Sequence, residues 1–170
     1  MVWNPTLNVI DTSVIDANLI TFIKANQVDA LTWANGGTAL KSFKTISDSV
    51  ADRTKPIFPR LSIVDSTEGT TSSGDLNDTA YQVTFECVFE SLTVATVTST
   101  AKKYDTALKS MLANISASAI TSGMLGVTSA RFISIESGFE ELASNKQQND
   151  FFSEWQVRVT YALAGSAYNS

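Results

Sequence analysis

The feature that most constrains the fold is a run of alternating side chains followed closely by a run of helical spacing. From Tyr81 to Phe89 the odd positions are apolar or aromatic and the even positions mostly polar. Successive side chains of a strand point to opposite faces, so this predicts a strand with one packed and one wet face. From Ser99 to Ile115 apolar residues recur every three or four positions. That spacing predicts an amphipathic helix, with Thr98 or Ser99 as its N-cap.

Further elements are predicted on either side of this centre. A helix is expected from about Ser13 to Gln27, with Trp33 as a later alternative end, because its apolar residues follow helical spacing. Gly36 and Gly37 would end it, since glycine adopts the left-handed stop conformation without a Cβ penalty. Strands are predicted over residues 57–64, 129–137 and 155–163. Residues 40–46 fit either a short strand or a loose connection.

Polar connections separate these elements. The longest is predicted over residues 66–78 and contains Glu68, Asp75 and Asp78. A loop of this length costs closure entropy, and it is usually either mobile or ordered by a partner. The other connecting segments are an irregular N-terminal segment at 1–12, a polar connection at 138–150 and a tail at 164–170.

The elements together predict an α+β fold, with a mainly antiparallel sheet of four or more strands and two helices packed on one face. Parallel neighbouring strands need a crossover connection, usually a helix, and one inter-strand connection here contains a convincing one. The sheet is therefore expected to be mainly antiparallel. The strands at 81–89 and 155–163 each present large apolar side chains to one side, so helices are expected to cover that side. At 170 residues the chain is expected to form a single domain, 1–170.

Charge and composition argue against several classes of function. The net charge is −5 and no basic cluster is present, which argues against tight binding of nucleic acid. Charged residues make up 17% of the chain, less than usual. Such a surface is either partly covered in an assembly or kept soluble by Ser and Thr. The N-terminus lacks the pattern of a signal peptide, and no apolar stretch reaches the length of a membrane span, so a soluble, cytosolically made protein is expected.

Sequence motifs for catalysis are missing. The chain has no histidine, which removes the commonest metal ligand and the usual general base. It has no Gly-rich phosphate loop, GxSxG elbow or CxxC pair. Cys87 lies on the apolar face of a predicted strand, where a small buried hydrophobe is expected. The sequence therefore predicts a protein that is not an enzyme and holds no cofactor.

Two groups of carboxylates are candidates for a metal site or a catalytic site. The first comprises Asp65, Glu68, Asp75 and Asp78. Calcium prefers such oxygen ligands, but the spacing matches no EF-hand, and a solvated charged loop is the simpler interpretation. The second comprises Glu86 and Glu90, which share one face of a predicted strand. A wet sheet face explains them better than a catalytic pair, so neither a metal site nor a catalytic site is predicted.

In the order of these elements, the chain resembles the tail-terminator or tail-completion proteins of long-tailed bacteriophages, which belong to the head-to-tail joining region. The resemblance is carried by the N-terminal helix, the proline-led strand at 56–65 with its polar arm, the strand–helix pair at 81–89 and 101–115, and the closing strand at 155–163. It implies a small α+β subunit that closes into a hexameric ring, caps the tail tube and meets the head connector. The start before Ser13 and the segment 35–55 depart from that pattern.

The resemblance also implies partners and a location. The partners are further copies of the chain, the tail tube protein and the head–tail connector proteins, with DNA only as passing cargo and no membrane. The location is the tail or neck of the virion, after assembly in the cytoplasm of a bacterial host. The candidate contact residues are Glu68, Asp75, Asp78, Glu140, Glu141 and Trp3. Glu86 and Glu90 are candidates for an acidic lumen past which DNA would slide.

Two alternatives stay open. One is another virion component of similar strand content, such as a tail-tube protein or a minor capsid or neck protein. The other is a small-ligand binding module with its pocket between helix and sheet.

Overall fold

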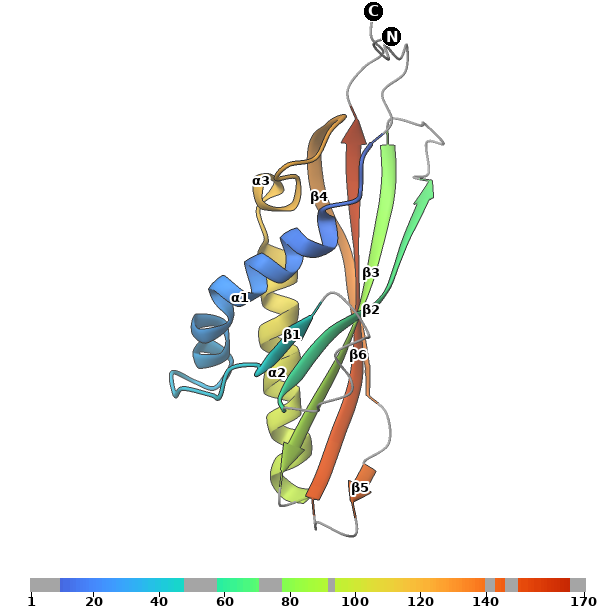
Figure 1. Cartoon of the computed structure of the whole chain (residues 1–170). Coiled ribbons are helices and arrows are strands. Elements are labelled where there is room, and N and C mark those ends of the chain that lie inside the picture. Colours follow the sequence, from blue (N-terminus) through green and yellow to red (C-terminus); the bar gives the residue numbers. More distant parts are fainter. Residues whose placement is uncertain are drawn as a thin grey trace, which may run out of the picture.

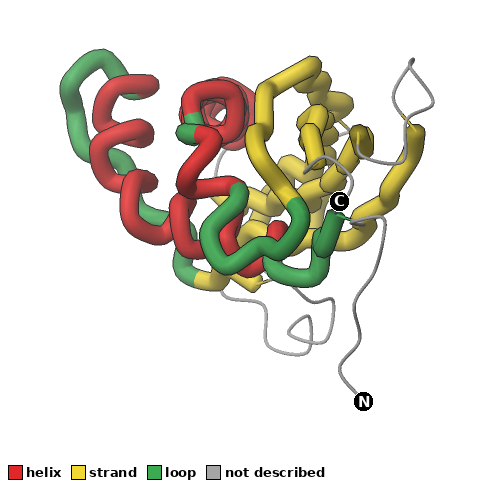
Figure 2. Tube along the Cα trace, turned by 90° about the horizontal axis from the view of Figure 1, so that it is seen from above, coloured by secondary structure: helices red, strands yellow, loops and turns green. Residues whose placement is uncertain are grey.

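The computed structural model describes residues 10–47, 58–70, 78–91, 94–139, 143–145 and 150–165. In chain order its elements are α1 (Ile15–Ala34), β1 (Thr45–Ser47), β2 (Arg60–Thr70), β3 (Asp78–Ser91), α2 (Val94–Asn114), α3 (Ala117–Ile120), β4 (Val127–Phe139), β5 (Ala143–Asn145) and β6 (Asp150–Gly165). The strands form one sheet and the helices lie on one side of it, as Figures 1 and 2 show. The predicted α+β class is confirmed.

The sheet has the strand order β1-β2-β3-β6-β4, and the short β5 pairs with the start of β6. Every pair is antiparallel except β1 with β2. The central ladder joins β3 to β6 in unbroken register, from Asp78 opposite Ala164 to Ser91 opposite Phe151. A mainly antiparallel sheet was predicted, and the structure confirms it with one parallel pair at its edge.

The alternating run of the sequence is the middle of this central ladder. Its odd-numbered residues and their partners on β6 face the helices and are buried: Tyr81, Val83, Phe85, Cys87, Trp155, Val157, Val159, Tyr161 and Leu163. Fully burying one large apolar side chain stabilises the fold by about 1.5–3 kcal/mol. This row is therefore the main source of stability in the sheet.

Helix α2 covers that row and α1 packs on α2, as Figure 1 shows. The stripe of α2 that was predicted from spacing is buried, with Tyr104 and Leu108 at its centre. The hydroxyl of Tyr104 donates a hydrogen bond to the carbonyl of Lys41, and that of Tyr161 donates to the carbonyl of Leu112 at 2.6 Å. Both phenols thus have a polar partner, which offsets the cost of burying them.

Several predicted boundaries are wrong in the same direction, because the elements are longer than expected. The predicted loop at 66–78 is wrong at both ends: β2 continues to Thr70 and β3 begins at Asp78. Glu68 and Gly69 are weak strand formers, but here each has a backbone partner on β3. Pairing with a neighbouring strand outweighs intrinsic propensity in such places.

The remaining corrections concern the second half of the chain. Helix α2 begins at Val94, so the predicted caps Thr98 and Ser99 lie within its first turns. The segment after it contains α3, whose N-cap Ser116 accepts a hydrogen bond from the amide of Ala119. Strand β4 extends to Phe139 and β5 occupies 143–145, so the predicted connection at 138–150 is partly strand. The predicted tail at 164–170 is likewise part of β6 up to residue 165.

The N-terminal half agrees better with the expectations. Helix α1 reaches Ala34, close to the later of the two predicted ends, and Gly36 and Gly37 follow it with φ of 64° and 89°. Of the undecided segment at 40–46, residues 40–44 form an irregular connection and the last two residues belong to β1, Thr45–Ser47, so each alternative holds for a part of it. Of the predicted irregular start at 1–12, residues 1–9 lie outside the described residues, as does most of the polar stretch after β1.

Candidate functional site at the sheet edges and the open face

The sheet face opposite the helices, which we call the open face, carries mainly polar side chains. The register brings Thr84, Arg158 and Glu136 side by side across β3, β6 and β4. Together with Gln156 and Gly138 they line a shallow cleft of about 420 Å³ on this face. Gly138 contributes no side chain there, and a Cβ at this position would meet no atom within 4 Å. Ser137 and Phe139 complete its lining, so the cleft is open and presents both polar and apolar groups.

Two ion pairs lie on the open face. Arg60 lies 3.2 Å from Glu86, and their side chains are 11% and 20% exposed. Arg158 lies 3.3 Å from Glu136 in a more exposed pair. The predicted wet face is therefore partly wrong at Glu86, whose carboxylate is half-buried against an arginine. An acidic lumen that includes Glu86 stays a prediction, and Arg60 offsets the negative charge that this residue would bring to it.

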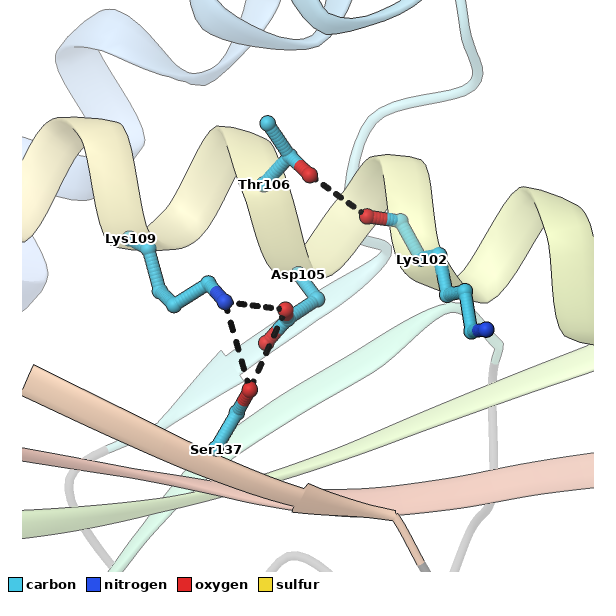
Figure 3. Close-up of polar contacts among 5 residues, drawn as sticks. All are labelled: Lys102, Asp105, Thr106, Lys109 and Ser137. Carbon is cyan, nitrogen blue, oxygen red and sulfur yellow. Dashed lines mark hydrogen bonds and ion pairs between the residues drawn. The ribbon is translucent and has the colours of Figure 1, made fainter.

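A second polar cluster lies on the opposite side of the sheet, between α2 and β4 (Figure 3). Asp105 is buried, and its Oδ2 lies 2.9 Å from Nζ of Lys109. Ser137 donates a hydrogen bond from its hydroxyl to Asp105 at 3.2 Å, and Lys109 donates to Ser137 at 3.3 Å. The cluster therefore ties the helix to the outermost long strand of the sheet.

Serine beside lysine is a combination that some hydrolases use, with the lysine as base. Here Lys109 is ion-paired with Asp105, and an ammonium group has no lone pair to take the proton of Ser137. The arrangement serves to position β4 on α2 rather than to activate a nucleophile. No sequence motif indicates this cluster. The spacing of four between Asp105 and Lys109 on one helix is nevertheless typical of a stabilising ion pair.

Strand β4 is at one end of the sheet. Its inner side pairs with β6, and within the described residues no strand lies along its outer side. It exposes three large apolar side chains, Phe132 at 37%, Ile133 at 44% and Phe139 at 37%. Phe132 and Phe139 each contact the core on one side, since their rings lie against Tyr161 and Trp155. The strand therefore combines an unpaired backbone edge with apolar surface.

A bulge shapes this strand. The register shifts between Phe132 and Ser134, so Ile133 is an extra residue without a partner on β6. Arg131 and Ile135 consequently face opposite sides of the sheet. Soluble proteins often protect an edge with bulges and charges. Here the bulge instead presents an isoleucine to the surface, which is not how an edge is protected.

The other end of the sheet is also partly unpaired. The short strand β1 pairs only with residues 60–62 of β2. A bulge at Val64 follows, where the register shifts between Ile63 and Asp65. From there to Thr70, nothing within the described part of the chain pairs with the outer side of β2. We call residues 64–70 the free half of β2.

The free half of β2 is anchored to the N-terminal end of α1. Asp16 accepts hydrogen bonds from Ser66 at 2.7 Å and from the hydroxyl of Tyr81 at 2.9 Å. Glu68 accepts a hydrogen bond from the side chain of Thr12. Burial raises the pKa of Tyr81 to about 12, and the carboxylate of Asp16 adds to this effect. The structure thus holds the start of the predicted arm in a defined position.

The predicted contact residues are described only in part. Glu68 is exposed on the free half of β2, and Glu90 lies at the far end of β3 beside Phe58 and Lys41. Asp78 begins β3, but its side chain is not described. Four predicted contact residues lie outside the described residues: Trp3, Asp75, Glu140 and Glu141. Their predicted roles therefore stay predictions.

Other site types receive no support from the described part of the chain. No group of three or more Cys, Asp or Glu residues comes together there in a way that could hold a metal ion. Cys87 is fully buried, and its burial raises the pKa of the thiol. None of the described helices has the length and apolarity needed to cross a bilayer. The space between α2 and the sheet is filled by fully buried side chains such as Tyr104, Trp155 and Tyr161.

No protein-family description matches the chain, and no curated protein matches it either. Among solved structures, it is similar to a chain from the virion of a native gene transfer agent particle. The similarity has a TM-score of 0.44 at 13% sequence identity, and it covers 89% of this chain and 95% of that chain. A TM-score at this level does not establish a common function, so any role for this chain must be argued from its own edges and faces.

Proposed function

We propose that this chain is a structural subunit of a virion, specifically a tail-terminator or tail-completion protein that closes into a ring. The observation that carries the proposal is that, among the described residues, no strand pairs with the outer side of β4 or with residues 64–70 of β2, and that β4 exposes Phe132 and Ile133. A strand edge with apolar side chains is a surface that pairs with another chain unless it is protected. A subunit with two different unpaired edges can bind copies of itself head to tail, which is the contact that generates rings.

The other parts of the proposal follow from the resemblance noted in the sequence. The ring, a hexamer, would cap the tail tube and present a surface to the head connector, with DNA passing through. The net charge of −5 and the paired charges of the open face are compatible with DNA passing without adhering. In this proposal the chain catalyses no reaction and acts through its shape and its contacts with other proteins.

The same edges also fit a second role, that of a tail-tube protein. A tube subunit needs the same lateral contacts, and it differs in that its rings stack on one another without limit. The length of the assembly distinguishes the two roles, so it is the quantity to measure.

Negative-stain microscopy and light scattering of the purified protein at micromolar concentration test the proposal. Single rings with a central hole are expected. Long tubes would contradict the terminator role and support the tail-tube role. A monomer that stays monomeric when tail tube protein is added would overturn the proposal.

A further inference from the structure

We infer that Asn35 is a site of spontaneous covalent modification, at which its side-chain amide is lost by reaction with the backbone nitrogen of Gly36, and that Lys103 binds the carboxylate that results. Asn35 is the one asparagine of the chain that glycine follows. Glycine has no Cβ to hinder attack by its own nitrogen. The inference goes beyond the proposed function and does not depend on it, because it concerns the chemistry of a single chain.

The reaction needs water as its only other reactant. The nitrogen of Gly36 forms a bond to Cγ of Asn35, the bond from Cγ to Nδ2 breaks, and Nδ2 leaves as ammonia after taking up the proton of the Gly36 N–H. Because both groups belong to one chain, the step avoids the entropy cost of bringing two molecules together. Water then opens the cyclic imide at one of its two carbonyl carbons, which gives either aspartate or isoaspartate. In isoaspartate the main chain runs through the side-chain carbon and is longer by one carbon.

The two residues lie in the turn that ends α1. Asn35 is the C-cap of this helix, with φ −100° and ψ 26°, and Gly36 follows it in the left-handed region with φ of 64°. Asn35 is partly buried and Gly36 is exposed. A Cβ built on Gly36 would meet no atom within 4 Å. The site is therefore accessible to the water that completes the reaction.

Hydrogen bonds hold both reacting groups in the folded chain. The N–H of Gly36 donates to the carbonyl of Trp33 at 3.1 Å. Nδ2 of Asn35 donates to the carbonyl of Thr38 at 3.0 Å. The nitrogen of Gly36 has to leave the carbonyl of Trp33 before it can approach Cγ of Asn35. The rate of the reaction therefore follows local opening of this turn, and helix ends open more readily than helix interiors.

Lys103 on α2 is placed to bind the product. Its Nζ donates a hydrogen bond to Oδ1 of Asn35 at 2.6 Å. No carboxylate of the described residues forms an ion pair with this ammonium group. Conversion of Asn35 to aspartate replaces a neutral acceptor with a charged one, and a charge-assisted hydrogen bond is stronger. The fold therefore accommodates aspartate, whereas isoaspartate lengthens the main chain and disrupts the turn.

Peptide mapping by mass spectrometry tests the reaction in the full-length protein, incubated at neutral pH either folded or unfolded in urea. The internal control is Asn114, which also ends a helix and whose Nδ2 also donates to a backbone carbonyl, but which Ile115 follows. We expect Asn35 to convert faster than Asn114 in both states, and faster in urea than in the folded protein. No faster conversion at Asn35 than at Asn114, or equal rates at Asn35 in both states, would overturn the inference.

Two glycine variants form a matched pair. Gly36→Ala and Gly37→Ala each place a Cβ at a left-handed position with open space around it, so both strain the turn. Only Gly36→Ala adds a side chain beside the attacking nitrogen. We expect Gly36→Ala to slow the conversion of Asn35 by about tenfold or more, and Gly37→Ala not to slow it. Equal slowing in both variants would contradict attack by the nitrogen of Gly36.

The role of Lys103 is tested by melting curves. Asn35→Asp reproduces one product without the reaction, and Lys103→Gln removes the ammonium group. We expect Asn35→Asp to maintain or raise the melting temperature in the otherwise unchanged protein and to lower it in the Lys103→Gln background. A loss of the same size in both backgrounds would overturn the role given to Lys103.

Discussion

The two faces of β6 differ in burial and in polarity. Trp155, Val157 and Val159 face the helices and are completely buried, whereas Gln156 and Arg158, which alternate with them, are exposed on the open face. The buried face is apolar and closely packed, and the open face is polar and carries ion pairs. We interpret this difference as follows: the buried face stabilises the fold, and the open face and the strand edges remain available for contacts with other molecules.

The largest effect is expected from a large-to-small change on the buried face. Trp155→Ala should lower the free energy of unfolding by about 3–5 kcal/mol, because it removes a fully buried side chain that also stacks on Phe139. Urea unfolding measures the change. The matched control is Gln156→Ala, one residue along on the open face, with an expected change within about 0.5 kcal/mol. Similar losses in both variants would mean that the two faces do not differ in this way.

A smaller effect is expected from the polar cluster beneath β4. Asp105→Ala should cost about 2 kcal/mol, because it removes the acceptor for Ser137 and the ion partner of Lys109. The lysine is partly exposed and can be solvated, which limits the loss. Thermal or urea unfolding measures it, and hydrogen exchange should show faster opening of β4 than of β3. Equal protection of both strands in the variant would show that the cluster does not hold β4.

A pH effect of about 1 kcal/mol is expected at the edge of the buried face. Tyr81 has a folded-state pKa raised to about 12, so the stability it contributes is fully present below about pH 10 and is lost as the pH rises towards 12. The figure is modest because its surroundings are only partly shielded from water. The unfolding free energies of the wild type and of Tyr81→Phe are measured between pH 9 and about 12. The difference between them should be smallest at about pH 12, where the contribution of Tyr81 is lost. Burial raises the pKa of Tyr104 to about 12 as well, so a residual pH dependence in the variant is expected.

The smallest effect is expected on the open face. Glu136→Ala breaks an exposed ion pair with Arg158 and should change the free energy of unfolding by less than about 0.5 kcal/mol. The small difference should shrink further when the salt concentration is raised, because salt screens exposed charges. Urea unfolding at low and high salt measures both. A loss comparable to that of Asp105→Ala would show that the open face does stabilise the subunit.

The buried face could be predicted from the sequence, and the reason is physical. The alternation through Phe85 and through Val157 and the helical spacing through Leu108 are local patterns that burial imposes, so the central strands and both long helices were expected at their positions. The ends of elements were not. The polar residues after Asp65 become strand only because β3 pairs with them, and that pairing is not visible in local sequence.

The candidate site was harder to predict because it depends on the register between paired strands and on the order of the strands in the sheet. The ion pair of Arg60 with Glu86 requires that β2 lie beside β3 with these residues two rungs apart on the same face. The exposed position of Ile133 requires a bulge, and a bulge shifts every following side chain to the other face. The unpaired edges themselves follow from strand order, which hydrophobic periodicity does not encode.

The central position of β6 has a consequence for biosynthesis. β3 ends at Ser91, and the strand that lies beside it begins only at Asp150. At a translation rate of about 5–20 residues per second, the ribosome needs roughly 3–12 s to make the intervening stretch. During that interval the aromatic row of β3 lacks its neighbour and can pair wrongly with another nascent chain. A chaperone that shields this row until β6 emerges would raise the yield of folded protein.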